Sequence, residues 1–203
     1  MLYRYAEGRG TAARFNFIID LDFLSPTELI CVDKNNHCLR HVDFALSPSE
    51  TSTFAGSCTT FGNADGHRLN SALFRIPTSA EVNSNNSTMF VIGHFQILHM
   101  IDLRTDTVTT LATFDSSCTD MKLLGDSLLY LPQKLRIIVF NLDTREERVV
   151  AGGESSGSAI GTFEHTMFNN AYALLKWRDG IKILLLVTDR FNNRFAGFAY
   201  DVR

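Results

Sequence analysis

The stretch LICVDKNNHCLRHVDF, Leu29 to Phe44, predicts a β-hairpin with a polar tip. Apolar residues alternate with polar ones on both sides of the segment DKNN, Asp33–Asn36, which is rich in turn-forming residues. The stretch LLVTDRFNNRFAGFAYD, Leu185 to Asp201, repeats this arrangement near the other end of the chain. A chain that contains the same hairpin twice is predicted to be built from repeated units.

The rest of the 203-residue chain also carries β-strand signals. Short segments rich in β-branched and aromatic residues alternate with clusters of Gly, Asn, Asp, Ser and Pro, and no segment of a dozen residues keeps a helical period. The third strands of successive groups end at Asp43, Asp102, Asn141 and Asp201, at intervals of 59, 39 and 60 residues. Four-stranded propeller blades recur at about this spacing. We therefore expect an all-β fold, a β-propeller of four-stranded antiparallel blades.

The two ends of the chain complement each other. Leu2 to Asn16 has the pattern of a fourth strand followed by a linker, and Arg194 to Tyr200 has the pattern of a third strand with no fourth strand after it. Pairing of Leu2–Tyr5 with Arg194–Tyr200 would complete the last blade and remove exposed sheet edges. We expect residues 1–203 to form a single domain of four blades, with the N-terminal strand closing the last blade.

The tip VDKNNHCLRHVD resembles the hallmark of NHL repeats, in which Asp, Asn and His lie at the turn between the second and third strands. VTDRFNNRFAGF is similar to it, with Asn193 at the position of His37, and the linkers ADG (Ala64–Gly66) and ALFRIP (Ala72–Pro77) resemble the inter-blade segment of this family. The resemblance is clearest in the first and last groups and weaker in VIGHFQILHMID and YLPQKLRIIVFNL. NHL propellers usually have six blades. The chain is therefore either a compact four-bladed ring, which its complementary ends favour, or a divergent or truncated relative.

The candidate binding surface consists of charged and polar residues in the two best-matched tips: Lys34, His37, Arg40, Arg190 and Arg194. Ring closure would place the first and last blades side by side, so these side chains would form one exposed basic patch. Charged tips are commonly no more than solvated, so the patch is either an interaction site or a hydrated surface. The Asp33 and Asp189 carboxylates are expected to accept backbone hydrogen bonds at the turns.

Asp20 and Asp22 alternate with apolar residues in the first strand and therefore share one face. That face either lines a central channel, where carboxylates would bind calcium or a cationic ligand, or is simply hydrated. Histidines do not occupy equivalent strand positions: His41 precedes the aligned aspartate by two residues and His99 by three. We therefore expect no metal site built from histidines and no resident cofactor, with calcium as the one candidate ion.

The chain has four cysteines: Cys31, Cys38, Cys58 and Cys118. They lack the paired spacing of a zinc site. Cys31 and Cys38 are placed symmetrically about Asp33–Asn36, so the hairpin permits a disulfide between them, and buried free thiols are the alternative. The segment NNST, Asn85–Thr88, contains two overlapping N-glycosylation sequons. The sequons favour an extracellular location over a cytoplasmic one.

Composition argues against several classes of function. The net charge is −3 and basic residues form no stripe, which argues against nucleic acid as a partner. No apolar run approaches the ~20 residues that span a bilayer, and the N-terminal segment MLYRYAEGRG has no apolar core, so we expect no signal peptide. We expect a non-enzymatic module, a monomer or weak oligomer, that binds a protein or glycan through loops on one face. A metal-dependent hydrolase or lyase that uses the channel is the alternative.

Overall fold

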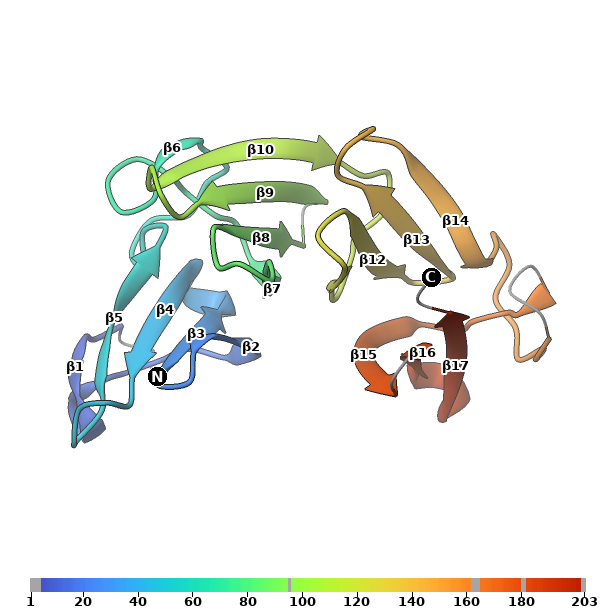
Figure 1. The fold of residues 1–203 in the computed structure, drawn as a ribbon, viewed down its shortest axis with the longest axis horizontal. Coiled ribbons are helices and arrows are strands. Elements are labelled where there is room, and N and C mark those ends of the chain that lie inside the picture. The colour runs from blue at the N-terminus through green and yellow to red at the C-terminus, as the bar shows by residue number, and fades with distance from the viewer. Residues whose placement is uncertain (1–4, 95, 162–164, 180–181, 202–203) are drawn as a thin grey trace. The chain divides into compact units, whose positions relative to one another are not determined.

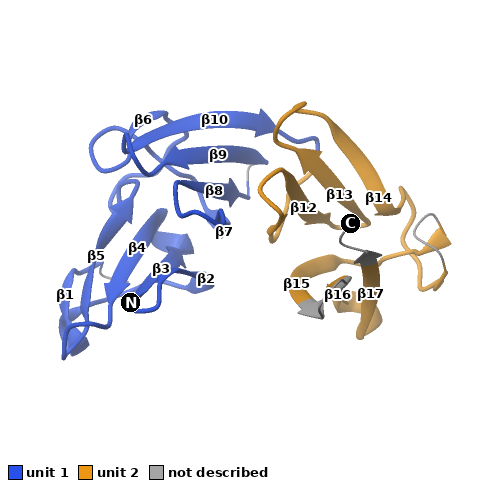
Figure 2. Cartoon of the chain, viewed as in Figure 1, with its two compact units in different colours: residues 1–115 blue, residues 116–203 orange. Residues whose placement is uncertain are grey.

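The computed structural model describes residues 5–94, 96–161, 165–179 and 182–201. Regular structure in these residues is almost all β, in four antiparallel sheets (Figure 1). The chain comprises two compact units, residues 1–115 with the first two sheets and residues 116–203 with the last two (Figure 2). Each sheet is a blade of the β-propeller type, so the predicted all-β fold with four blades is confirmed. The single domain over residues 1–203 stays a prediction.

The first unit contains two five-stranded blades, each with its longer strands joined in sequence order and one short strand added at the outer edge. The strands of blade 1 are, in spatial order, β1 (Gly8–Arg9), β5 (Glu50–Ala55), β4 (Cys38–Asp43), β3 (Glu28–Asp33) and β2 (Ile18–Ser25). Those of blade 2 are β6 (Gly66–His67), β10 (Thr107–Thr113), β9 (Ile97–Asp102), β8 (Thr88–Gly93) and β7 (Pro77–Val82).

The second unit contains a four-stranded and a three-stranded blade. The strands of blade 3 are β11 (Lys122–Leu124), β12 (Leu128–Gln133), β13 (Arg136–Asn141) and β14 (Glu147–Gly152). Those of blade 4 are β15 (Ala171–Asp179), β16 (Lys182–Asp189) and β17 (Arg194–Asp201). Short 3-10 helices are η1 (Gly10–Ala12), η2 (Lys34–Asn36) and η4 (Arg190–Asn192). Within the described part of the chain, no helix has the length and apolar character needed to cross a membrane.

The third strand of each blade ends where the sequence period predicts. These strands are β4, β9, β13 and β17, and they end at Asp43, Asp102, Asn141 and Asp201. In the first three blades the terminal side-chain oxygen accepts a hydrogen bond at 2.8 Å from the backbone N–H two residues further on. This local bond stabilises a tight turn. The period is therefore visible in the sequence because each turn needs a short polar side chain at the same place.

Apolar packing between neighbouring blades forms the core of each unit. In the first unit, buried side chains of blade 1 such as Ile30 and Leu39 pack against those of blade 2 such as Met89 and Val91, and β2 lies beside β7. In the second unit, the buried residues of blades 3 and 4 include Tyr130, Ile137, Leu174, Leu185 and Val187. Burial of each large aliphatic side chain contributes about 1.5–3 kcal/mol, so blade-to-blade packing stabilises both units.

Cys38 forms a disulfide with Cys58, whose Cα atom lies 5.1 Å away. The bridge that the sequence permitted between Cys31 and Cys38 does not form, because β3 and β4 pair in a different register. Cys38 lies opposite Asp33 and Cys31 lies opposite Arg40, so the two cysteines are diagonal neighbours. Cys31 is instead a buried free thiol, and burial raises its pKa to about 11.

The N-terminal segment lies against blade 1 where it is described. Glu7 Oε1 accepts hydrogen bonds from the Tyr5 hydroxyl at 2.6 Å and from the backbone N–H of Thr53 at 2.8 Å. These bonds lower the pKa of Glu7, the bond from Tyr5 having the largest effect. The predicted pairing of Leu2–Tyr5 with Arg194–Tyr200 falls largely on residues 1–4, which lie outside the described part of the chain. Closure of the last blade by the N-terminal strand therefore stays a prediction.

Candidate functional site

The Asp33 carboxylate is the centre of the tip of blade 1. Asp33 ends β3 and is fully buried. Its Oδ1 atom accepts a hydrogen bond from the backbone N–H of Asn16 at 2.8 Å, and its Oδ2 atom accepts one from Asn36 Nδ2 at 2.8 Å. A carboxylate removed from water needs such donors, since burial otherwise penalises its charge. The expectation that Asp33 accepts a backbone hydrogen bond is confirmed.

Arg40 is the cationic partner of Asp33, and its side chain has no exposed surface. Nη1 donates to Asp33 Oδ2 at 3.4 Å and to the carbonyl oxygen of Arg14 at 3.1 Å, and Nη2 donates to the carbonyl oxygen of Ala6 at 2.9 Å. The guanidinium carbon lies 4.7 Å from the centre of the Tyr5 ring. The prediction that Arg40 belongs to an exposed patch is therefore wrong, because the N-terminal segment covers it.

The tip of blade 4 repeats this arrangement around Asp189, which is also fully buried. Oδ1 accepts from the backbone N–H of Asn169 at 2.8 Å, and Oδ2 accepts from Asn192 Nδ2 at 2.7 Å and from Arg194 Nε at 2.9 Å. The two Nη atoms of Arg194 donate to carbonyl oxygens of the linker before β15. Only 16% of the Arg194 side chain is exposed. Arg194, like Arg40, was predicted at the surface and instead holds a linker against its blade.

His37 has a structural contact in the first unit. It adopts the left-handed backbone conformation with φ of 62°, and its Nδ1 atom accepts a hydrogen bond from the backbone N–H of Ile76 at 3.0 Å. An accepting Nδ1 requires a neutral imidazole that carries its proton on Nε2. Burial, followed by the nearby Arg75 guanidinium, holds the pKa of His37 below its ordinary value. His37 thus links the tip of blade 1 to the start of blade 2.

Lys34 and Arg190 are the remaining members of the predicted patch. Lys34 in the first unit is half-buried, with Nζ 5.5 Å from the centre of the Phe17 ring. Arg190 in the second unit is exposed, with its guanidinium carbon 5.3 Å from the centre of the Tyr172 ring. Binding through these two residues stays a prediction.

Asp20 and Asp22 attach blade 1 to blade 2. Asp20 Oδ2 accepts hydrogen bonds from Ser79 Oγ at 2.6 Å and from the backbone N–H of Ala80 at 3.0 Å, and Asp22 Oδ2 accepts one from the backbone N–H of Val82 at 2.8 Å. The donors belong to β7, whose outward N–H groups have no strand beyond them in the sheet. Carboxylates at alternate positions of β2 therefore accept hydrogen bonds from backbone N–H groups of an edge strand, which would otherwise bond to water.

Asp120 plays the same part in the second unit, and the sequence-based predictions did not include it. Its Oδ2 atom accepts from the backbone N–H of Leu174 in β15 at 2.6 Å. Lys176 of β15 in turn donates from Nζ to the carbonyl oxygen of Leu123 at 2.7 Å. The sequence signal that could have identified Asp120 is the segment TDMKLL, in which an aspartate precedes a short strand. This strand, β11, is an edge strand of blade 3, as β2 with its segment DLDFL is of blade 1.

The tips of blades 2 and 3 lack the acid. Gly93 ends β8 and Gln133 ends β12, at the positions of Asp33 and Asp189. A Cβ atom on Gly93 would lie 3.0 Å from the carbonyl oxygen of Arg75, so the linker backbone already fills this space. Gln133 Oε1 accepts from Arg136 Nε at 2.6 Å. Blade 3 thus retains an acceptor for arginine without a buried negative charge.

Metal-binding chemistry has little support in the described residues. No three side chains among the histidines, cysteines, aspartates and glutamates described there converge as metal ligands would. Asp20 and Asp22, the calcium candidates, each use one oxygen to cap β7. Calcium binding at this pair stays a prediction.

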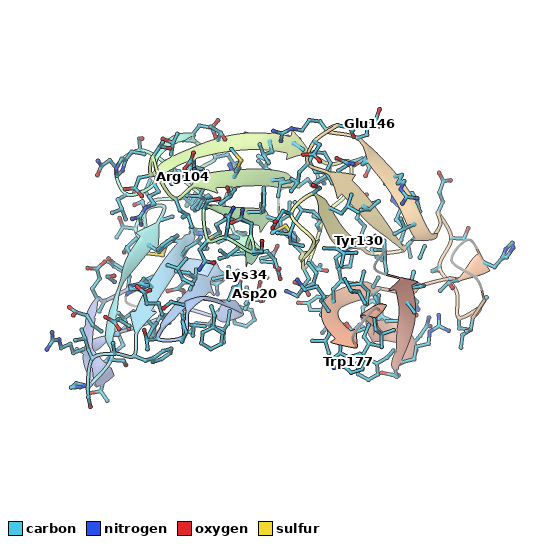
Figure 3. All side chains as sticks on the ribbon, in the orientation of Figure 1. Asp20, Lys34, Arg104, Tyr130, Glu146 and Trp177 are labelled. Carbon is cyan, nitrogen blue, oxygen red and sulfur yellow. A yellow bond between two sulfur atoms is a disulfide. The ribbon has the colours of Figure 1, made fainter. Side chains whose placement is uncertain are left out.

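Blade 4 presents an apolar surface on one side of its sheet, called the free face below. The strand register places its residues together: Leu175, Trp177, Leu184, Leu186 and Phe195. Trp177 is 53% exposed and Phe195 75% exposed. The opposite side of the same sheet packs against blade 3, and in Figure 3 Trp177 lies on the side of the sheet away from Tyr130.

Blade 1 also exposes large apolar side chains on its inner strand. Leu21 is 54% exposed and Phe23 is 62% exposed. They alternate with Asp20 and Asp22 along β2, so the two carboxylates point toward blade 2 and the apolar pair lies on the other side of the strand. Figure 3 shows Asp20 and Lys34 in this part of the first unit. The apolar runs of both blades were visible in the sequence, but exposure was not predicted because such runs also occur in strands buried on both faces.

Comparison with known proteins gives the fold alone. No family model and no curated protein matches the chain. The crystal structure of a structural genomics protein of unknown function from Bacteroides thetaiotaomicron matches 98% of the chain, with a TM-score of 0.62 and 11% sequence identity. The tricorn protease matches 88% of it, with a TM-score of 0.50 and 14% identity. The chain spans 47% of the length of the first structure and 16% of the second.

Proposed function

We propose that the chain is a non-enzymatic interaction module, built from NHL-type propeller blades, that binds another protein. The observation that carries the proposal is the free face of blade 4, with Trp177 and Phe195 more than half exposed. Exposed aromatic side chains within a continuous apolar surface are typical of protein interfaces. Propeller blades suit such a role because they hold the surface on a rigid sheet.

Tip chemistry supports the NHL assignment. In blades 1 and 4 a buried aspartate at the end of the second strand accepts hydrogen bonds from an asparagine three residues later and from a backbone N–H of the linker. Asp, Asn and His at this turn are the residues on which the resemblance rests. The same contacts support a structural role for the tips. We therefore place the main binding surface on the free face, and binding through Lys34 or Arg190 stays a separate prediction.

The composition of the free face favours a protein over a glycan. Aromatic rings that stack on sugars need neighbouring polar groups to bond the hydroxyls, whereas the described neighbours of Trp177 on this face, Leu175 on its own strand and Leu184 opposite it, are apolar. The other side of the sheet already packs on blade 3 through Leu174 and Leu185. The partner that fits the apolar residues of the free face is an apolar β-sheet surface of another protein, which would pack in the same way.

Site-specific crosslinking tests the proposal. A photoreactive amino acid replaces Trp177 in the full chain, and a matched variant carries it at Val149, which is 48% exposed on β14 of the same unit. We expect the probe at residue 177, and not the one at residue 149, to capture a single protein from the native source. The captured protein is then purified and its Kd measured against the unmodified chain, Trp177→Ser and Val149→Ser.

We expect Trp177→Ser to weaken binding by about thirtyfold, the effect of losing a central aromatic contact, and Val149→Ser to leave Kd unchanged within about twofold. Circular dichroism confirms that both variants stay folded. Equal effects of the two substitutions, capture of a second copy of this chain, or binding of a glycan without a protein would each overturn the proposal.

A further inference from the structure

The turn between β7 and β8 contains both N-glycosylation sequons of the chain. Asn85 begins Asn-Asn-Ser and Asn86 begins Asn-Ser-Thr. Asn83 organises the turn: its Oδ1 atom accepts hydrogen bonds from the backbone N–H groups of Ser87 and Thr88, at 2.9 and 3.0 Å. The two acceptor asparagines thus lie on a turn fixed by a third residue, and both are exposed.

The two asparagines differ in what their side-chain nitrogen does. Asn86 Nδ2 donates to the carbonyl oxygen of Leu24 at 2.7 Å, which joins the turn to β2 of blade 1. A sugar on this nitrogen would compete with that contact. Asn85 uses its Oδ1 atom to accept from the backbone N–H of Ser87 at 3.0 Å, and its Nδ2 atom has no hydrogen-bond partner within the described part of the chain. The folded blade therefore accommodates a bulky group on Asn85 without losing a bond.

The disulfide between Cys38 and Cys58 is an independent observation that points to the same compartment. Disulfides persist in oxidising environments, which include the secretory lumen where N-glycosylation takes place. A structural disulfide and an exposed sequon in the same unit are therefore consistent with a chain that matures there.

We propose that Asn85, and not Asn86, is an N-glycosylation site. The donor is a lipid-diphosphate-linked oligosaccharide. A bond forms between Asn85 Nδ2 and the anomeric carbon of the sugar, and the bond from that carbon to the diphosphate oxygen breaks. The lipid diphosphate leaves with the electron pair, and a base takes one amide proton. The glycan then covers the turn between β7 and β8.

The overlap of the sequons provides a test that leaves both asparagines in place. Ser87→Ala removes the hydroxyl residue of the Asn85 sequon, and Thr88→Ala removes that of the Asn86 sequon. The full chain and both variants are secreted from eukaryotic cells behind a cleavable signal sequence. Peptide N-glycosidase treatment followed by peptide mass spectrometry locates any glycan, because the enzyme converts the glycosylated asparagine to aspartate.

We expect one glycan on the unmodified chain, at Asn85, complete loss of it in Ser87→Ala, and full retention in Thr88→Ala. Asn85→Gln should also remove the glycan and Asn86→Gln should retain it, and both of these variants leave Ser87 and Thr88 in place. Intact-mass detection of the Cys38–Cys58 bridge shows that the secreted chains are folded. A glycan on Asn86, or a secreted and disulfide-bonded chain without a glycan, would overturn the proposal.

Discussion

The tips of blade 1 and blade 4 both surround a buried aspartate with an asparagine, a backbone N–H and an arginine, and they differ in where the arginine enters. In blade 4, Arg194 lies directly opposite Asp189 in the strand register. In blade 1, Cys38 takes that position opposite Asp33, and Arg40 comes two residues later. Both arginines nevertheless donate to the Oδ2 atom of their aspartate.

This difference in register changes how deeply the arginine side chain is buried. The Arg40 side chain has no exposed surface, whereas Arg194 keeps 16% of its side chain exposed. Arginine can therefore reach the same acceptor from two register positions, and the deeper position frees Cys38 to bond Cys58. The two tips therefore share the aspartate oxygen that accepts the bond, and not the sequence position of the arginine that donates it. The difference in burial also predicts that the two tips respond differently to the same substitutions.

Substitution of the buried aspartate should have the largest effect on the free energy of unfolding, and this effect should differ between the two tips. Asp33→Ala leaves the Arg40 charge buried without its counter-charge, and we expect a loss of about 3–5 kcal/mol in the free energy of unfolding of the first unit. Asp189→Ala should cost the second unit about 1–3 kcal/mol, because Arg194 can turn toward water. Trp177 is the one tryptophan of the chain, so its fluorescence in urea follows the second unit, while hydrogen exchange of β4 peptides follows the first.

Asp143→Ala is the matched control, since Asp143 is exposed in a turn of blade 3, and we expect a change below about 0.5 kcal/mol. Equal losses for Asp33→Ala and Asp189→Ala would contradict the difference in burial. A loss of binding with full stability would instead assign the tips a direct functional role.

Removal of the disulfide should affect the first unit alone. The bridge joins residues 20 positions apart, and a loop of this size contributes about 3 kcal/mol by restricting the unfolded chain. We expect the double variant Cys38→Ser, Cys58→Ser to lose about this amount in the first unit, with no change in Trp177 fluorescence unfolding. Reductant should destabilise the unmodified chain and leave the double variant unaffected. Reductant sensitivity of the double variant would show that another bond is responsible.

Much of the fold could be predicted from the sequence because its signals are local. The ends of the third strands at Asp43, Asp102 and Asn141 each require a short polar side chain that bonds the backbone of its own turn. The register of the first hairpin was less visible. The turn consists of Lys34–His37, one residue further along than the polar tip suggested, and this shift is why the bridge that the sequence permitted between Cys31 and Cys38 does not form.

The site was harder to predict because it depends on what covers each strand. Alternation along β4 indicates which side of the sheet Arg40 occupies, but not that residues from the distant N-terminal segment enclose it. Likewise Asp20 and Asp22 were correctly placed on one face, while their bonds to β7 link residues about sixty positions apart. Contacts of this kind arise from packing between blades, which no local pattern encodes.

Substitution of the tip asparagines should have a smaller effect. Asn36→Ala and Asn192→Ala each remove one donor from the aspartate, and we expect a loss of about 1 kcal/mol in each unit. Asn36 is buried and Asn192 half-buried, so the first loss should be the larger. Urea unfolding with the two unit-specific probes measures both. A larger effect at Asn192 would indicate that its second bond, to the carbonyl oxygen of Gly157, matters more than the contact with Asp189.

The smallest expected effect is a pH dependence confined to the first unit. His37 must be neutral to accept the hydrogen bond from Ile76, and burial holds its pKa below the ordinary value of about 6.5. The unfolded chain therefore takes up a proton near pH 6.5, and the folded chain does so only at lower pH. The stability contributed by His37 is complete above pH 6.5 and is lost as the pH falls through the folded pKa. Blade 4 has Asn193, which does not titrate, at the corresponding left-handed position.

His37→Asn gives blade 1 the residue of blade 4 and should reduce the slope of stability against pH between about pH 6.5 and 5. The slope should not vanish, because burial also lowers the pKa of His99 in the same unit. Hydrogen exchange of peptides from β3, β4 and β7 at several pH values measures the effect. If His37→Asn kept the slope of the unmodified chain, the bond to Ile76 would not be the proton-sensitive contact, and His99 would account for the pH dependence of this unit.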